Sequence, residues 1–405
     1  MTLTVNDLPA EGSDGLRRSA GLLLLLSRID FTPAQKDQAK EEIRSFSAWK
    51  LFAGLAVRHG VAALVWQNIS DLGLAGSVPE TEKTLLEGLR FKSIARVSWI
   101  TEAAAGVTAL LEKEGVKVLL LKGLALEHTV YGSGGLRQMS DADLLVAPSD
   151  ALKARDILVR EGFSSMPLKS PLYRKIILDL GNHLPELHRG GISVDLHYRL
   201  FGTEGGDMVA RAIEESEIIV SGDRHFRVLP PMISFLALVS HIYKHEIKGE
   251  FQLRLWTDIC LLLERYGGSI LVPVLPAAAE EAGIPAETRI VLTVMEQVWG
   301  VMIPETMRAK TEEEQSKADR FLTDLAHPGA VESVSQREMF RRNLEALRST
   351  RKKMIFILGD VFPSVGFMKK RYSCRSSLSA VLHYPHRLGK LFWILGLFMA
   401  KNRGN

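Results

Sequence analysis

The chain is poor in cysteine and has no very long apolar segment. Its two cysteines, Cys260 and Cys374, lie far apart in 405 residues and lack the paired spacing of a metal site. This argues against a disulfide-rich secreted scaffold and favours a reducing, cytoplasmic setting. No run of about 20 apolar residues occurs, so we expect no ordinary transmembrane helix.

Several familiar short motifs are also missing. The apolar segment after Arg17 and Arg18 is short, acidic residues precede it, and no small-residue cleavage site follows, so we expect a buried helix rather than a signal peptide. The glycine-rich YGSGGLR (131–137) lacks the Gly-Lys-[Ser/Thr] ending of a P-loop and is expected to form a flexible turn. We find no convincing nucleophile elbow, internal repeat or low-complexity segment.

What the chain does have is a change of period along its length. Residues 16 to 115 carry apolar residues at spacings of three and four, and such patterns return near residue 230. Between them, shorter runs predict buried strands and a hairpin that turns at Gly190-Gly191. We therefore predict an α+β protein with a mixed sheet between helical regions. Its expected parts are an N-terminal helical region (1–115), an α/β core (116–225), a C-terminal helical domain (226–345) and a basic, partly apolar tail (346–405).

Two neighbouring strands of this core carry acidic residues. Asp141 and Asp143 stand two apart at the start of an apolar run, so in a strand they project from the same face. Asp195 lies on the polar face of the alternating ISVDLHYRL (192–200), and a two-residue turn would place Glu186 opposite it. Adjacent carboxylates repel, so a cation, a proton or open solvent must offset their charge. Three such acids suit Mg²⁺ or Mn²⁺, although a lone Asp-x-Asp pair is more often a solvated loop edge or a helix cap.

The order of these segments resembles the nucleotidyltransferase superfamily with the polymerase-beta-like fold. More narrowly, it resembles the uncharacterised bacterial family labelled nucleotidyltransferase family protein. The segments that carry the resemblance are LLLKGLAL (119–126), YGSGGLRQMSDADLLV (131–146), PSDALKARDILVREGF (148–163), HLPELHRGGISVDLHYRL (183–200), SHIYKHEIKGEFQLRLWTDICLLL (240–263) and FPSVGFMKKRY (362–372).

The resemblance implies roles for individual residues. Asp141 and Asp143 would be the first metal-binding pair, and Asp195 the third acid, which helps to bind the metal and activates the acceptor hydroxyl. The superfamily's Gly-Ser pair, which cradles the triphosphate, is replaced here by Lys122-Gly123, where the lysine could offer a positive charge to a phosphate.

Other residues near the acids are candidates for the nucleotide site. Arg137 could hold a phosphate with its planar guanidinium, or it could form a salt bridge to the acidic cluster. His183 and His197 are further nucleotide-site candidates by the same resemblance, whereas zinc binding lacks a compact ligand spacing. His241 and His245, four apart on a predicted helix, are read as a packed helix face, a metal pair or part of the cleft lining.

These observations predict an enzyme. It would be a Mg²⁺- or Mn²⁺-dependent nucleotidyltransferase that moves a nucleoside monophosphate from an NTP to an unknown acceptor and releases pyrophosphate. The altered Lys122-Gly123 motif leaves an alternative, a catalytically inactive binding or regulatory module with the same fold.

The C-terminal tail differs in charge from the rest of the chain. From residue 337 onward there are 15 Lys/Arg against 3 Asp/Glu, a net +12, so the preceding residues carry −8 of the overall +4. An apolar stretch within residues 387–401 is too short to span a bilayer. It could lie at the surface of the inner membrane, dock on a partner or form a last core helix. The sequence gives no firm nucleic-acid signal.

Overall fold

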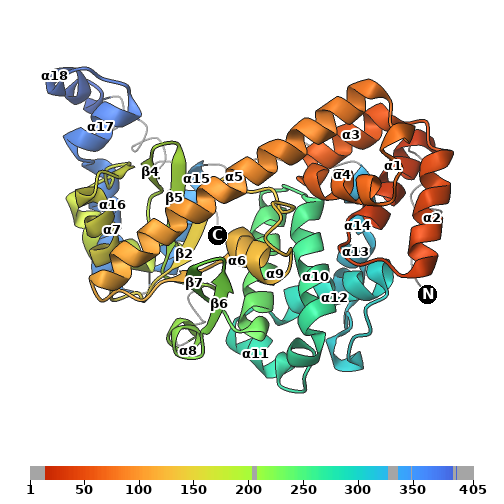
Figure 1. Ribbon diagram of the computed structural model, residues 1–405. Helices are drawn as coiled ribbons and strands as arrows, with labels where there is room; N and C mark the ends of the chain where they lie inside the picture. Colours follow the sequence, from red (N-terminus) through yellow and green to blue (C-terminus); the bar gives the residue numbers. More distant parts are fainter. Residues whose placement is uncertain (1–13, 203–207, 327–335, 348, 386–388, 390–405) are drawn as a thin grey trace.

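The computed structural model describes residues 14–202, 208–326, 336–347, 349–385 and 389. A mixed seven-stranded sheet lies at the centre of the sequence, and helices precede and follow it (Figure 1). This arrangement confirms the predicted α+β class.

The helices fall into those that precede or accompany the sheet and those that follow it. The first group is α1 (Asp14–Leu26), α2 (Pro33–Arg44), α3 (Trp49–Arg58), α4 (Ala62–Asp71), α5 (Glu80–Lys113), α6 (Lys122–Thr129), α7 (Ala151–Arg160) and α8 (Met208–Glu214). The second is α9 (Pro231–Ile247), α10 (Leu253–Ile270), α11 (Leu275–Glu281), α12 (Pro285–Trp299), α13 (Glu312–Asp319), α14 (Phe321–Ala326), α15 (Gln336–Ala346), α16 (Thr350–Val361), α17 (Val365–Arg371) and α18 (Ser377–Val381).

The sheet has the strand order β3-β4-β5-β2-β1-β7-β6. Strands β5 and β2 run parallel, as do β1 and β7, and the other neighbouring pairs are antiparallel. The strands are β1 (Leu119–Leu120), β2 (Ala142–Leu145), β3 (Ser164–Ser165), β4 (Leu187–Arg189), β5 (Ile192–His197), β6 (Glu217–Ser221) and β7 (Arg224–Val228).

The hairpin of β4 and β5 turns at Gly190-Gly191, as predicted. Arg189 pairs with Ile192, so the loop has two residues, and both glycines have positive φ, 57° and 80°. This backbone suits the twist of a two-residue hairpin and favours glycine. A side chain at position 191 is also blocked, because its Cβ would lie 2.9 Å from Cη2 of Trp99 on α5.

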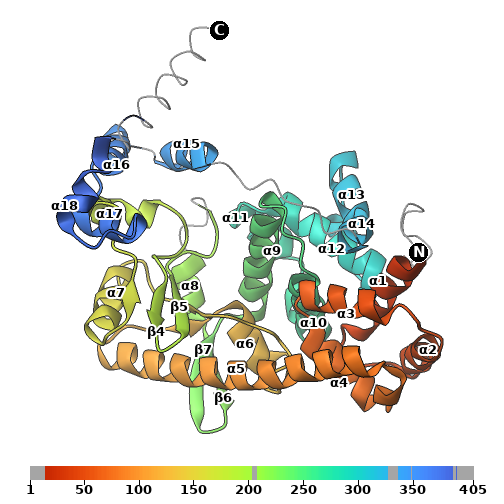
Figure 2. The same ribbon diagram turned by 90° about the horizontal axis from the view of Figure 1, so that it is seen from above.

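The long helix α5 connects the helical part of the molecule to the sheet. It contacts α3 and α4 near one end and β2, β5 and α7 toward the other (Figure 2). With 34 residues it is roughly 50 Å long. By length and composition alone α5 is apolar enough to cross a membrane, as is the sharply bent pair of α10 and α11 if it is counted as one span. In the fold, however, Arg90 and Arg96 of α5 donate to the carbonyls of Gly135 and Gly191, as expected of a helix packed within the protein.

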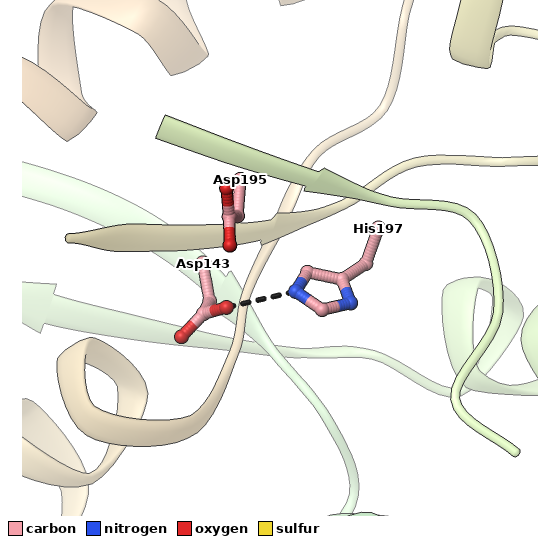
Figure 3. A group of neighbouring side chains, drawn as sticks. All are labelled: Asp143, Asp195 and His197. Carbon is pink, nitrogen blue, oxygen red and sulfur yellow. Dashed lines mark hydrogen bonds and ion pairs between the residues drawn. The ribbon is translucent and has the colours of Figure 1, made fainter. Parts of the chain in front are cut away.

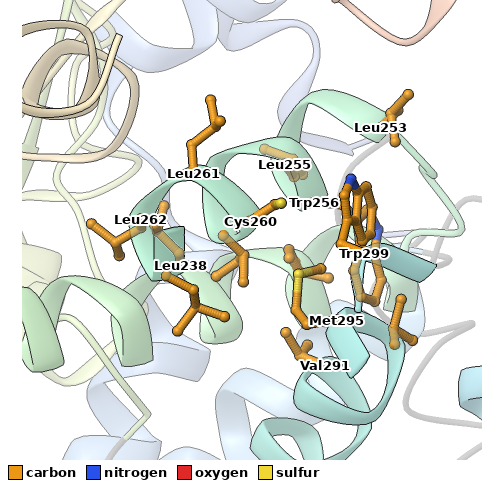
Figure 4. Close-up of a cluster of buried hydrophobic side chains, with 14 of the residues drawn as sticks. Leu238, Leu253, Leu255, Trp256, Cys260, Leu261, Leu262, Val291, Met295 and Trp299 are labelled. Carbon is orange, nitrogen blue, oxygen red and sulfur yellow. The ribbon is translucent and has the colours of Figure 1, made fainter. Parts of the chain in front are cut away.

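Two hydrophobic cores lie on opposite faces of the sheet. One face packs against the C-terminal half of α5 and against α7, with Leu144, Val194 and Leu196 in that core. The other face, through Leu119 and Leu145, joins a larger core that contains both the N-terminal helices and helices α9 to α14. Figure 4 shows part of this larger core, where α9, α10 and α12 meet. The helical regions that precede and follow the sheet therefore share one core.

Candidate functional site

Strands β2 and β5 bring the predicted acids together. Asp143 is the direct cross-strand partner of Asp195, and Leu145 is the partner of His197. Figure 3 shows the side chains of Asp143, Asp195 and His197 gathered together. Because side chains alternate along a strand, Asp143, Asp195 and His197 project from one face of the sheet. The other face of β5 carries Ile192, Val194 and Leu196 into the core, which confirms the predicted division of its two faces.

Three of these side chains could hold a metal ion. Ligand atoms of Asp143, Asp195 and His197 lie within 4.8 Å of one another. The Oδ1 atom of Asp195 is buried and, among the described residues, has no hydrogen-bond partner. Two carboxylates and an imidazole are ligands that Mn²⁺ accepts readily and that Mg²⁺ accepts mainly through the oxygens. The residues present therefore fit a divalent cation.

Asp141 stands apart from this three-residue group. It precedes β2 and lines the same cavity, but the cluster of potential ligands contains His197 in its place. Burial, followed by the nearby charge of Asp143, raises the pKa of Asp141. Its role in a metal pair with Asp143 stays a prediction.

A lysine and a histidine converge on one oxygen of Asp143. Nζ of Lys122 and Nε2 of His197 each lie 2.7 Å from Oδ1 of Asp143, and they are 3.3 Å from each other. Burial acts to raise the pKa of Asp143, but the Lys122 ammonium and the His197 hydrogen bond outweigh it and hold that pKa well below its usual range. Burial lowers the pKa of His197 to about 4, so this imidazole is neutral near pH 7 and donates its Nε2 proton to Asp143.

Asp195 has the opposite electrostatic environment. Burial raises its pKa to about 6, and the neighbouring charges of Asp143, Asp141 and Glu186 act in the same direction, while His183 opposes them. The ring of His183 lies 5.2 Å from that of His197, between centroids. The charge of Glu186 thus acts on Asp195, while the Glu186 side chain accepts a hydrogen bond from Ser193; a direct cross-strand pair of Glu186 and Asp195 stays a prediction.

Arg137 and Gly123 belong to a buried polar network behind the acids. The guanidinium of Arg137 forms a two-point ion pair with Asp258 of α10, with Nη2 to Oδ2 at 2.7 Å and Nε to Oδ1 at 3.2 Å. A Cβ on Gly123 would lie 2.2 Å from Nη1 of Arg137, so this glycine allows the guanidinium to approach the start of α6. Buried Glu127 accepts hydrogen bonds from the backbone N–H groups of Gly135 and Arg137.

This network corrects one sequence expectation. The partner of Arg137 is Asp258 and not the acidic cluster of Asp141 and Asp143. Although Arg137 borders the cavity, its side chain is only 6% exposed. Glu127 and Tyr131, whose hydroxyl donates to Asp258, were not anticipated. The available signal was a glutamate and a tyrosine four residues apart, Glu127 inside α6 and Tyr131 just after it, in a segment that is mostly buried.

The acids face a cavity of about 350 Å³ between the sheet and α9. His241 and His245 line it from α9, which confirms the cleft-lining interpretation of these histidines. Basic residues that the sequence analysis did not single out also line it: Arg199, Lys244, Lys248 and Arg254. A group of acids thus faces a wall rich in basic residues.

The tail is described only to residue 385 and at residue 389. The expected contact through residues 387–401 therefore lies, apart from residue 389, outside the described residues.

A mixed sheet that presents paired carboxylates to a basic cavity is an arrangement suited to metal-assisted phosphate chemistry. In comparison with known proteins, residues 46–300, more than half of the chain, match the family model described as Uncharacterised nucleotidyltransferase. The chain belongs to this nucleotidyltransferase family, which makes it a member of the transferases. No curated protein and no solved structure matches the chain.

Proposed function

We propose that the protein is a divalent-metal-dependent nucleotidyltransferase that transfers a nucleoside monophosphate from an NTP to a hydroxyl or phosphate acceptor and releases pyrophosphate. The observation that carries this proposal is the meeting of Asp143, Asp195 and His197 on adjacent strands, with Asp141 beside them, at a cavity whose opposite wall is basic.

In the proposed reaction, an acceptor oxygen forms a bond to the α-phosphorus while the bond from that phosphorus to the oxygen bridging it to the β-phosphate breaks. The electron pair of the broken bond leaves with pyrophosphate. Asp195, which lines the cavity, takes the acceptor proton through its carboxylate. Asp141, Asp143 and Asp195 would hold Mg²⁺ or Mn²⁺, with His197 beside them, and such an ion would offset the charge of the phosphates.

The remaining candidate residues have supporting roles. His197 and Lys122 keep Asp143 ionised and oriented. Lys122 stands close enough to the acids to meet a phosphate there. Gly123 and Arg137 act behind the site by fixing the start of α6 and the loop before β2, and His183 packs beside His197.

A second candidate function is a nucleotidyltransferase-like binding or regulatory module without turnover. The ammonium of Lys122 favours it, because this internal cation already neutralises Asp143 where a metal ion would bind. In an active enzyme Lys122 would have to share that carboxylate with the metal or turn toward the phosphates.

The test is nucleotide binding by the full chain, measured calorimetrically for each NTP with and without Mg²⁺ or Mn²⁺. We expect metal-dependent binding in the wild type that disappears in an Asp141→Asn/Asp143→Asn double variant. Binding without turnover, for any acceptor offered, would favour the regulatory module. Absence of nucleotide binding in the wild type would overturn the proposed enzyme and favour a module that binds a partner chain.

For the cellular setting, we propose a cytoplasmic location, with contact to the inner membrane or a partner through residues 387–401. The scarcity of cysteine and the basic tail support this proposal.

A further inference from the structure

The cavity raises the question of which groups bind a polyphosphate. The turn after β1 offers Lys122-Gly123, where the resemblance implies a Gly-Ser pair. Lys122 is paired with Asp143, and the guanidinium of Arg137 is paired with Asp258. The two cations that the sequence offered for phosphates are therefore engaged by carboxylates.

Helix α9 and Lys248, the residue that caps its C-terminus, present four basic side chains to the same cavity. His241, Lys244, His245 and Lys248 line it at positions i, i+3, i+4 and i+7, which share one face of a helix. We call these four residues the α9 basic stripe. Other positions of α9, including Tyr243, border a separate cavity of about 540 Å³. The stripe thus faces Asp143 and Asp195 across the candidate site, whereas Tyr243 and Glu246 of α9 border the other cavity.

The lysines of the stripe have no acidic partner that would explain their position. Within the described part of the chain, Lys244 and Lys248 form no salt bridge, and neither does Arg199 on the sheet side of the cavity. The two histidines differ. The rings of His241 and His245 pack edge to face at 4.6 Å, and Nδ1 of His245 lies 2.7 Å from Glu250. The lysines therefore provide the available positive charge, whereas the histidines pack against each other between them.

We propose that the α9 basic stripe, through Lys244 and Lys248, binds the β- and γ-phosphates of the nucleotide and takes the place of a phosphate-cradling loop after β1. This inference rests on the proposed function for its ligand, since it concerns the same site.

Electrostatics and size support this assignment. Burial in the cavity, then the charges of Lys122 and Lys248, lower the pKa of Lys244 to about 8, although its side chain keeps contact with solvent. Cations that repel one another across a cavity gain when a polyanion binds between them. A volume of about 350 Å³ lies at the lower end of the range for small-molecule pockets. It suits a polyphosphate and the reacting groups, with the nucleoside extending toward the opening.

The experiment uses inorganic tripolyphosphate and ATP as probes, each with and without Mn²⁺, and the full chain as protein. Calorimetry would compare the wild type with Lys244→Gln, Lys248→Gln and the double variant. We expect affinity for tripolyphosphate to fall about tenfold in each single variant and about a hundredfold in the double variant. Affinity for Mn²⁺ alone should be unchanged, because the metal cluster is on the strands. Tyr243→Phe is the matched control, since it changes α9 on its other cavity and should bind as the wild type does.

The outcomes separate the two proposals. Wild-type affinity for tripolyphosphate in a folded double variant would overturn the phosphate-binding role of α9 and leave the proposed function standing. Lysine-dependent binding that needs no metal and supports no nucleotidyl transfer would keep the role of α9 and reject the proposed enzyme. Failure of the wild type to bind either probe would overturn both.

Discussion

At the scale of single residues, Lys122 has an unusual backbone. It is a non-glycine residue with φ of 48°, in the left-handed region that costs a side-chain-bearing residue free energy. Its ammonium lies 2.7 Å from Asp143, and that contact is a reason for the chain to tolerate the strain. Strained backbone of this kind collects at functional sites, in agreement with a role for Lys122 in the chemistry.

Asp143→Asn should abolish nucleotidyl transfer. The amide keeps the shape of the side chain but removes the charge that Lys122, His197 and a divalent ion share. We expect turnover to fall on the order of a thousandfold or more, with an unchanged circular dichroism spectrum. Full activity in this variant would reject the assignment of Asp143.

Asp195→Asn should stabilise the metal-free protein while it removes metal binding. Its Oδ1 is buried without a hydrogen-bond partner in the described part of the chain, close to the charges of Asp143 and Glu186, so the neutral amide relieves repulsion. We expect thermal denaturation in a chelator to occur at a higher temperature than in the wild type. Added Mn²⁺ should raise the melting temperature of the wild type and leave that of the variant unchanged. A variant that Mn²⁺ still stabilises would show that Asp195 is not a ligand.

At the scale of elements, the start of α6 depends on the close approach of Gly123 to Arg137. Gly123→Ala should destabilise the protein by about 2 kcal/mol or more, because the added Cβ would displace the guanidinium from its buried ion pair with Asp258. Chemical denaturation would measure the change in the free energy of unfolding.

Gly106→Ala on α5 is the control for that substitution. No atom of the described residues lies within 4 Å of its added Cβ, so the free energy of unfolding should rise by about 0.5–1 kcal/mol through helix propensity. A Gly123→Ala variant as stable as the wild type would mean that Arg137 can move at little cost.

The sequence predicted those elements whose signal is local. The alternation in ISVDLHYRL and the Gly190-Gly191 pair predict the hairpin and the face that carries Asp195, because period and turn type are set by neighbouring residues. The β6–β7 hairpin was not predicted from the sequence, although the pair Gly222-Asp223, a typical turn sequence, separates its two strands. The pairing of Arg137 with Asp258 could not be read from the sequence, since 121 positions separate the two residues.

At the scale of the whole molecule, His59 joins helices that are far apart in the chain. Its Nε2 lies 3.0 Å from the carbonyl oxygen of Leu325, and its Nδ1 accepts from the backbone N–H of Leu253. The imidazole is fully buried and neutral, and burial lowers its pKa to about 4. It thus connects α3 with α14 and with the start of α10. The sequence predicts helices before and after the sheet, but helical periodicity does not say which helices pack together.

The pH dependence of stability should report this histidine. In the unfolded chain a histidine takes up a proton near its ordinary pKa of 6.5, whereas folded His59 resists it until about pH 4. The stability that neutral His59 contributes is therefore present above pH 6.5 and is lost as the pH falls toward 4, by at most about 1.4 kcal/mol per pH unit. Denaturation curves from pH 7.5 to 4 should show a shallower loss in His59→Gln than in the wild type. Equal slopes of stability against pH in the two proteins would show that protonation of His59 does not determine the pH dependence of stability.

The two walls of the cavity pack mainly in different hydrophobic cores, and this affects how their mutations combine. Val194 and Leu196, which flank Asp195 on β5, pack in the core beneath the sheet, whereas Lys244 stands on a helix of the larger core, which Leu145 of β2 also joins. Without ligand, the effects of Asp195→Asn and Lys244→Gln on the free energy of unfolding should add, because within the described part of the chain no salt bridge joins the two side chains. With Mn²⁺ and tripolyphosphate bound, the same double-mutant cycle should show a non-additive term. The bound metal ion and polyphosphate would then couple the two halves of the site energetically.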